Sequence, residues 1–179
     1  MIVIALLRGI NVGGSRALKM QDLIDGFESL GYKNAATYLQ SGNVIFDSPG
    51  SAAASLEKMI GSMILKRRKL EVNVVVRTVK QWDDIIRGNP FLGNKNHDPA
   101  FLHVTFLNKS TRGTKIELSK EGQEDYRVSD REIYLYCPNG YGRTKMNNQQ
   151  IEKKTGLIAT TRNWNTVLAI RELAQRKDR

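Results

Sequence analysis

An α+β fold is predicted by two features of the sequence. Short apolar runs alternate with stretches in which apolar residues recur at helical spacing, and the same order of elements occurs twice. Each half is predicted as strand, helix, strand, strand, helix and strand, followed by an extra trailing helix. Because a βαββαβ unit commonly folds as a split-βαβ, ferredoxin-like sandwich, we predict a duplication of two such halves packed together. The repeat is one of architecture, since the halves share no clear residue identity.

The first half begins with a continuous apolar run at residues 2–7, which is typical of a strand buried on both faces. A glycine-rich loop follows, and then a helix with apolar residues at helical spacing, which Gly31 ends. A second predicted helix runs from Ser51 to the cations Lys66–Lys69, which suit the negative end of a helix dipole. Its apolar stripe consists of Leu56, Met59, Ile60, Met63 and Ile64. The other elements of this half are strands at 35–40, 43–47 and 72–76 and a trailing helix that carries Trp82 and reaches Asn89.

A polar stretch rich in helix and strand breakers, residues 93–99, separates the two halves. We therefore predict a first half at 1–92, a linker at 93–100 and a second half at 101–179. The predicted elements of the second half are a strand at 101–107, a weak helix at 114–120, a hairpin of 125–128 and 132–136, a helix at 144–154, a short extended piece at 156–160 and a final helix marked by Trp164 and Val167.

Length and composition indicate a protein with a core of its own. A chain of 179 residues buries roughly 70% of its unfolded surface. Cys137 is the single cysteine, which excludes an intramolecular disulfide and favours a reducing compartment. No stretch approaches the roughly 20 apolar residues of a membrane span, and the N-terminus lacks the cationic start and cleavage site of a signal peptide. We therefore predict a cytoplasmic protein without membrane contact.

The formal net charge of +10 and the isoelectric point near 9.8 favour anionic partners, nucleic acid among them. Many cytoplasmic proteins are basic without a polyanion partner, so the charge alone decides little. Arg67 and Arg68, at the cationic end of the second helix, are candidate contacts for nucleic acid. Tyr134 and Tyr136 are expected to face outward from the core of their half, beside His103 and Arg127, on a face where bases would stack. We favour the alternative that this face of the sheet packs against the other half, because exposed apolar sheet faces are rarely left bare.

The loop between the first strand and the first helix, Leu6–Arg16, contains three glycines and is the first candidate site. Such a loop leaves N–H groups directed at an anion where the helix begins. It is not a phosphate-binding P-loop, because no Gly-Lys-Ser/Thr follows, and it lacks the G-x-G-x-x-G spacing of dinucleotide sites. The alternative is that the glycines only let the chain turn tightly. The candidate ligand contacts in this loop are Arg8, Asn11, Gly13 and Gly14.

The split-βαβ topology brings the end of the first strand, the turn between the second and third strands and the end of the second helix to one edge. In this chain the edge would gather the glycine-rich loop, the turn Ser41–Asn43 and the cations Lys66–Lys69. Ser41 and Asn43 are therefore further candidate contacts for an anion. The alternative is that serine, glycine and asparagine only meet the needs of a tight turn.

A third candidate region, Thr160–Thr166, is predicted to open the final helix. Thr161 or Asn163 would cap this helix by accepting hydrogen bonds from its first N–H groups. Capping does not explain Arg162, whose charge opposes the helix dipole at an N-terminus. We therefore predict that Arg162 contacts either an anionic ligand or a carboxylate of the protein.

Three of these stretches together resemble the domain-of-unknown-function 1697 family. They are ALLRGINVGG at 5–14, YLQSGNV at 38–44 and ATTRNWNTV at 159–167. The resemblance covers essentially the whole chain and implies two similar α+β halves. It implies no established activity, so no catalytic residue is carried over from the family.

Signatures of catalysis are missing from the sequence. His97 and His103 have no cysteine or carboxylate at metal-ligand spacing, and no serine lies in a nucleophile motif. Cys137 follows an apolar strand and is expected to be inert. We predict no metal and no cofactor.

The sequence favours a binding module for a small anionic or nucleotide-like ligand at the glycine-rich loop. The alternatives are a nucleic-acid-binding protein and an enzyme acting on a phosphorylated or carboxylated metabolite. The protein is predicted to be a monomer or a homodimer, in which strand 72–76 would offer an edge for pairing.

Overall fold

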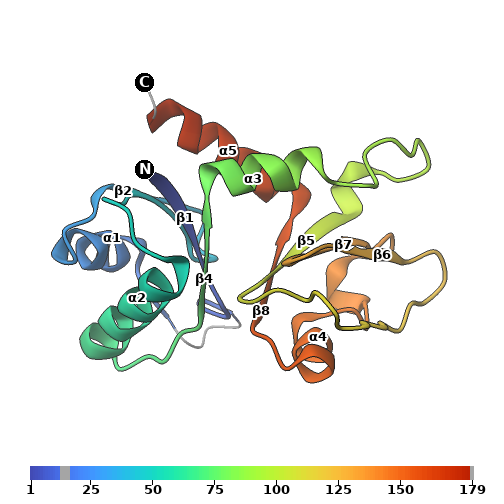
Figure 1. The fold of residues 1–179 in the computed structure, drawn as a ribbon, viewed down its shortest axis with the longest axis horizontal. Helices are drawn as coiled ribbons and strands as arrows, with labels where there is room; N and C mark the ends of the chain where they lie inside the picture. The colour runs from blue at the N-terminus through green and yellow to red at the C-terminus, as the bar shows by residue number, and fades with distance from the viewer. Residues whose placement is uncertain (13–16, 178–179) are drawn as a thin grey trace. The chain divides into compact units, whose positions relative to one another are not determined.

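The computed structural model describes residues 1–12 and 17–177 (Figure 1). The described residues form a mixed α+β protein with two four-stranded antiparallel sheets and five α-helices. The chain divides into two compact units, one made of Met1–Asp83 with Ile170–Arg179 and the other of Asp84–Ala169. This division lies before the predicted linker at 93–100, and the C-terminal residues join the first unit.

The first sheet contains the four strands predicted for the first half. They are β1 (Ile2–Leu7), β2 (Lys33–Tyr38), β3 (Asn43–Asp47) and β4 (Val74–Thr78), in the order β2-β3-β1-β4. All six residues of β1 are buried, as its unbroken apolar run predicts, and the strand pairs with β3 on one side and β4 on the other.

Helices α1 (Met20–Ser29) and α2 (Ala53–Arg68) pack against the first sheet (Figure 1). Three aromatic rings form the centre of the core between α1 and the sheet. The ring of Phe46 on β3 lies 4.9 Å from that of Phe27 and 4.8 Å from that of Tyr32, measured between ring centroids. Both predicted helices are confirmed, and Lys69 ends α2 with a left-handed backbone conformation.

Helices α3 (Val79–Arg87) and α5 (Trp164–Lys177) follow the two outer strands directly. Arg171 on α5 forms an ion pair with Asp83 on α3, with 3.0 Å between Nη2 and Oδ2. Lys177, also on α5, donates a hydrogen bond to the carbonyl oxygen of Asn34 on β2. These two contacts join the C-terminal part of α5 to the first unit.

The second sheet consists of β5 (Leu102–Leu107), β6 (Asp125–Val128), β7 (Glu132–Tyr136) and β8 (Ala159–Asn163), in the order β6-β7-β5-β8. Helix α4 (Asn148–Thr155) packs near β8, and its Ile151 shares a core with Leu107, Ile133 and Leu135. Single turns of 3₁₀ helix occur at Pro99–Phe101 and Tyr141–Arg143.

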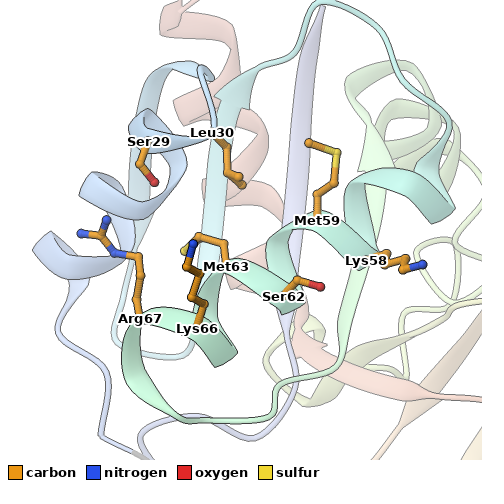
Figure 2. A pocket seen from close by; sticks show the side chains of 8 residues that line it. All are labelled: Ser29, Leu30, Lys58, Met59, Ser62, Met63, Lys66 and Arg67. Carbon is orange, nitrogen blue, oxygen red and sulfur yellow. The ribbon is translucent and has the colours of Figure 1, made fainter.

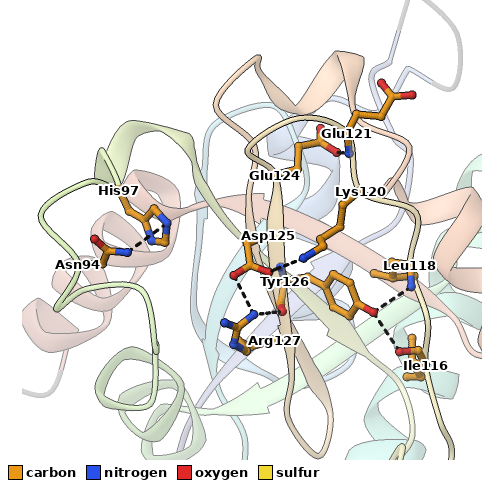
Figure 3. Close-up of polar contacts among 10 residues, drawn as sticks. All are labelled: Asn94, His97, Ile116, Leu118, Lys120, Glu121, Glu124, Asp125, Tyr126 and Arg127. Atoms are coloured by element: carbon orange, nitrogen blue, oxygen red, sulfur yellow. Dashed lines mark hydrogen bonds and ion pairs between the residues drawn. The ribbon is translucent and has the colours of Figure 1, made fainter.

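The weak helix predicted at 114–120 is wrong, because these residues form neither helix nor strand. Ile116 and Leu118 are both buried against the second core and stand two positions apart, which is an extended rather than a helical spacing. Tyr126 on β6 holds this segment in place (Figure 3). Its hydroxyl donates to the carbonyl oxygen of Ile116 at 3.3 Å and accepts from the N–H of Leu118 at 3.1 Å.

Each sheet has an outer strand with a backbone N–H bonded to a glutamate of the preceding helix. Glu57 on α2 accepts from the N–H of Val76 on β4 at 3.0 Å, and Glu152 on α4 accepts from the N–H of Ala159 on β8 at 3.1 Å. On β4 the N–H of Thr78 is also bonded, to a side-chain oxygen of the α3 residue Gln81. Backbone N–H groups that already donate to a side chain make the edge of a sheet less able to pair with another strand. Pairing of two copies through β4 stays a prediction.

None of the described helices is long and apolar enough to cross a lipid bilayer.

Candidate functional site

Three connecting segments of the first unit meet at one edge of its sheet, and of the predicted cations Lys66–Lys69 they include Lys69. The N–H of Leu7 donates to the carbonyl oxygen of Gly42 at 2.8 Å, and the N–H of Arg8 donates to that of Asn73 at 2.9 Å. We call the described residues of these segments, 8–12, 39–42 and 69–73, the loop edge. It joins the end of β1 to the β2–β3 turn and to the α2–β4 connection.

Asn11 braces the loop edge with its side chain. Its Oδ1 accepts from the N–H of Leu18 at 2.7 Å, and its Nδ2 donates to the carbonyl oxygens of Leu18 at 3.0 Å and Gln40 at 2.8 Å. The buried side chains of Ile10 and Leu18 anchor the loop in the first core. Asn11 therefore positions the loop. The candidate contacts Gly13 and Gly14 lie outside the described residues.

Asn43 closes the β2–β3 turn from inside. Its side chain is fully buried, and its Nδ2 donates to the carbonyl oxygen of Tyr38 at 2.8 Å and to Oγ of Ser41 at 3.0 Å. The predicted contact between Asn43 and a ligand is therefore corrected, since the carboxamide is enclosed by its own turn. Ser41 is exposed at the tip of the turn.

Left-handed backbone conformations gather at the loop edge. Three of its residues that are not glycine have positive φ angles, namely Asn11 at 54°, Leu39 at 58° and Lys69 at 54°. Such conformations are costly for residues with a side chain and concentrate at functional surfaces. Two large apolar side chains are also exposed there, Val12 at 62% and Leu39 at 56%. Among the described residues, three of the four with a side chain and a positive φ therefore lie at the loop edge, together with two exposed apolar side chains.

Helix α1 begins at Met20, shortly after the glycine-rich loop. The side chain of its N-cap residue, Lys19, makes no capping hydrogen bond. The first N–H groups of a helix have no partner within the helix and attract negative charge. In the first turn Asp22 pairs with Arg68 on α2, with 3.3 Å between the charged atoms. Arg68, a candidate for nucleic-acid contact, is therefore engaged in an ion pair.

Arg67 lies near the end of α2, where it lines a groove between α1 and α2 (Figure 2). It makes no hydrogen bond or ion pair with the part of the chain that the structure describes. The two neighbouring candidates for nucleic-acid contact therefore differ in their surroundings. Arg68 forms an ion pair with Asp22 on α1, whereas Arg67 lies beside the groove without a partner among the described residues.

The base-stacking role considered for Tyr134 and Tyr136 is wrong, because both residues are buried, in keeping with the favoured expectation that this face is covered. The hydroxyl of Tyr134 donates to the carbonyl oxygen of Ile85 at 3.0 Å. The ring of His97 lies on Tyr136, with 4.1 Å between ring centroids. The segment from Ile85 to His97 covers this face of the sheet, so the two tyrosines are not accessible for stacking bases.

Arg162 lies in strand β8 and not at a helix N-terminus, which corrects the argument from the helix dipole. Its buried guanidinium donates through Nη1 to Oγ1 of Thr160 and to the carbonyl oxygen of Thr161, both at 2.9 Å. The capping role predicted for Asn163 is confirmed, since its Oδ1 accepts from the N–H of Asn165 at 2.9 Å.

Arg162 has a counterpart in the first unit that the sequence analysis missed. Arg77 is likewise the fourth residue of its outer strand, stands two residues before a helix and is buried. Its Nη1 donates to the carbonyl oxygen of Val76 at 2.9 Å. A buried arginine in the same position of both units favours a structural role for Arg162.

A polar network on the second sheet was also missed. The hydroxyl of Thr161 meets that of Thr105 at 2.7 Å, that of Tyr141 at 3.1 Å and Oδ1 of Asn148 at 2.7 Å. His103 stacks on Tyr141, with 5.0 Å between ring centroids. Burial lowers the pKa of His103, which favours a neutral ring. The network connects α4 to the sheet. Its signal in the sequence was the pair of polar residues, His103 and Thr105, at alternate positions of the otherwise apolar strand β5.

Among residues 1–12 and 17–177, no three histidine, cysteine or acidic side chains come together as metal ligands.

Cys137 is expected to resist alkylation in the folded protein. Burial raises the pKa of its thiol to about 12, with the charge of Glu124 as a further cause. The thiolate is the reactive form, so at pH 8 only about one molecule in ten thousand would carry it. Iodoacetamide should therefore modify Cys137 rapidly in denaturant and slowly without it, as mass spectrometry would show. Equal rates in the two conditions would contradict this placement.

The comparisons with known proteins address the fold and the family. The conserved bacterial protein SP0830 from Streptococcus pneumoniae has a solved structure with a TM-score of 0.71 and 19% sequence identity. The similarity covers 97% of this chain and 98% of that chain, and it shows the fold alone. None of the curated proteins compared with the chain matches it. The family described as "Protein of unknown function (DUF1697)" matches residues 1–134, and the chain therefore belongs to this family.

Proposed function

We propose that the protein is a binding module for a small anionic or nucleotide-like ligand, which it holds at the loop edge. The observation that carries this proposal is the convergence of three segments on one edge, through the hydrogen bonds of Leu7 and Arg8. Left-handed residues and two exposed apolar side chains accompany it. The start of α1 adds helix N–H groups, which favour a phosphate or carboxylate.

The proposed roles of the individual residues follow from their surroundings. Arg8 and Ser41 would contact the anion, because the first is a cation and the second an exposed hydroxyl on adjoining segments. Asn11 would hold the loop in its binding conformation. The exposed side chains of Val12 and Leu39 would cover an apolar part of the ligand, such as a base. Arg162 has no part in this proposal.

A thermal-shift screen tests the proposal with inorganic phosphate, sugar phosphates, mononucleotides and a short single-stranded RNA, each at low and moderate salt. A ligand at a hundredfold excess over its Kd adds about 2.7 kcal/mol to the free energy of unfolding. We expect a small phosphate compound to raise the Tm, and this increase should persist at moderate salt.

Arg8→Gln removes one positive charge from the loop edge. Its matched variant, Arg143→Gln, removes one positive charge from an exposed turn of the second unit. The proposal requires that only the first variant loses the ligand-dependent increase in Tm. Shifts that appear only with RNA and vanish with salt would instead indicate nucleic-acid binding through counterion release. That outcome would refute the proposed site.

We also infer that the two units are repeats of one split-βαβ unit. The strand orders β2-β3-β1-β4 and β6-β7-β5-β8 correspond position by position. Each unit also has a glutamate bonded to its outer strand, Glu57 in the first and Glu152 in the second. Each has a buried arginine in that strand as well, Arg77 in the first and Arg162 in the second. The described residues of the second unit include no helix between β5 and β6, where the first unit has α1 between β1 and β2.

A cytoplasmic location is part of the proposal as well. It rests on the single cysteine, since a lone buried thiol needs no oxidising compartment. Fractionation of cells that produce the protein, followed by immunodetection, would test this location.

A further inference from the structure

A groove of about 750 Å³ lies on the first unit, between the end of α1 and the outer surface of α2 (Figure 2). Pockets for small molecules typically have volumes of about 300–1,000 Å³. Eight residues line the groove: Ser29, Leu30, Lys58, Met59, Ser62, Met63, Lys66 and Arg67. A standard protein–protein interface takes roughly 20–30 residues from each side, so the groove has the size of a small-molecule site.

The floor of the groove is apolar and adaptable. It consists of Leu30, the residue that follows α1, and of Met59 and Met63 from α2. Met59 is 43% exposed, although its sulfur accepts a hydrogen bond from the hydroxyl of the buried Tyr32 at 3.8 Å. Methionine side chains are flexible and polarisable, and they suit surfaces that accept chains of varied shape.

The rim of the groove is positively charged and uncompensated. Lys58, Lys66 and Arg67 line it, and no acidic residue does. None of these three cations makes an ion pair or a hydrogen bond with the residues that the structure describes, whereas the next residue, Arg68, is paired with Asp22. An apolar floor beside unpaired cations is complementary to a molecule with an apolar chain and one anionic end.

We propose that this groove binds a linear amphipathic anion, a fatty-acid-like carboxylate. Its hydrocarbon chain lies over Leu30, Met59 and Met63, and its carboxylate meets Lys66 and Arg67 at the end of α2. Burial of the chain supplies about 0.8 kcal/mol for each methylene group removed from water. The cations select the sign of the head group. The site shares no residue with the loop edge and is independent of the function proposed there.

Isothermal titration calorimetry on the full chain tests the proposal with three probes that have the same chain and different heads. Decanoate, decanol and decyltrimethylammonium are titrated separately, the two ions below their critical micelle concentrations and decanol below its solubility limit in water. We expect decanoate to bind at one site, decanol about tenfold more weakly because it lacks the charge-assisted contact, and the ammonium compound not measurably.

Two variants locate the site without removing a core residue. Ser62→Trp fills the groove at an exposed helical position and leaves the charge unchanged, and serine and tryptophan have similar helix propensities. It should abolish decanoate binding while the Tm stays close to that of the parent protein. Lys66→Glu with Arg67→Glu reverses the charge of the rim and should weaken decanoate at least tenfold while weakening decanol little.

The matched control is Lys153→Glu with Lys154→Glu, which reverses the same number of charges in the last turn of α4 in the second unit. This double variant should bind decanoate like the parent protein. Equal loss of binding in both charge-reversed variants would overturn the proposal, because it would show attraction to the net charge alone. Unchanged decanoate binding by Ser62→Trp, or equal affinity for decanoate and decanol, would also overturn it.

Discussion

Gly42→Ala is expected to lower the free energy of unfolding by about 2–5 kcal/mol, the largest loss among the substitutions considered at the loop edge. Gly42 has a φ of 77°, a conformation that costs a residue with a side chain about 1–2 kcal/mol. A Cβ atom there would stand 2.7 Å from Cβ of Leu7 and 2.8 Å from Cδ1 of Ile10. Both neighbours are buried, so relief requires movement of the core, at about 1–3 kcal/mol more.

Gly31→Ala is the matched control for this prediction, and urea denaturation is the measurement. Gly31 has a φ of 80°, but a Cβ atom added there would meet nothing within 4 Å. This control should therefore show only the cost of the left-handed backbone, about 1–2 kcal/mol. If the two substitutions cost the same, the close approach of the β2–β3 turn to β1 is not as described.

Asn11→Ala is expected to cost about 2–3 kcal/mol of stability. The substitution removes three hydrogen bonds, two with Leu18 and one with Gln40, each worth about 1 kcal/mol. It also places alanine at a φ of 54°, which asparagine tolerates better. Chemical denaturation followed by circular dichroism would measure the loss.

Asn34→Ala provides the control, because Asn34 is also left-handed, with a φ of 53°. Its side chain makes one exposed hydrogen bond, to Oδ2 of Asp47. Asn11→Ala should therefore be the more destabilising of the two. The opposite order would mean that Asn11 does not brace the loop and is available to a ligand.

Much of the fold follows from local pattern in the sequence. The unbroken apolar run of β1 and the helical stripe of α2 both lead to the observed elements. The helix predicted at 114–120 failed because Ile116 and Leu118 follow the period of an extended chain, and the contact that fixes them comes from Tyr126 on a later strand. Such a contact depends on tertiary structure that local pattern does not contain.

The candidate site was predictable in its location and less so in its chemistry. Topology alone brings the glycine-rich loop to the β2–β3 turn, because the strand order follows from the element order. Whether an asparagine binds a ligand or its own backbone depends on hydrogen bonds that spacing does not reveal, as Asn43 demonstrates. The groove escaped prediction because Met59 belongs to the apolar stripe of α2, and only the packed structure leaves it partly uncovered.

An NMR titration of the ¹⁵N-labelled full chain with a mononucleotide and with inorganic phosphate tests the central claim most directly. Binding at the loop edge predicts that amide shifts change together, and saturably, at 8–12, 39–42 and 69–73 and in the first turn of α1. The Arg8→Gln variant should lose these changes and Arg143→Gln should keep them. Shift changes spread over the basic surface, or none at the loop edge at saturating concentration, would contradict the proposed function.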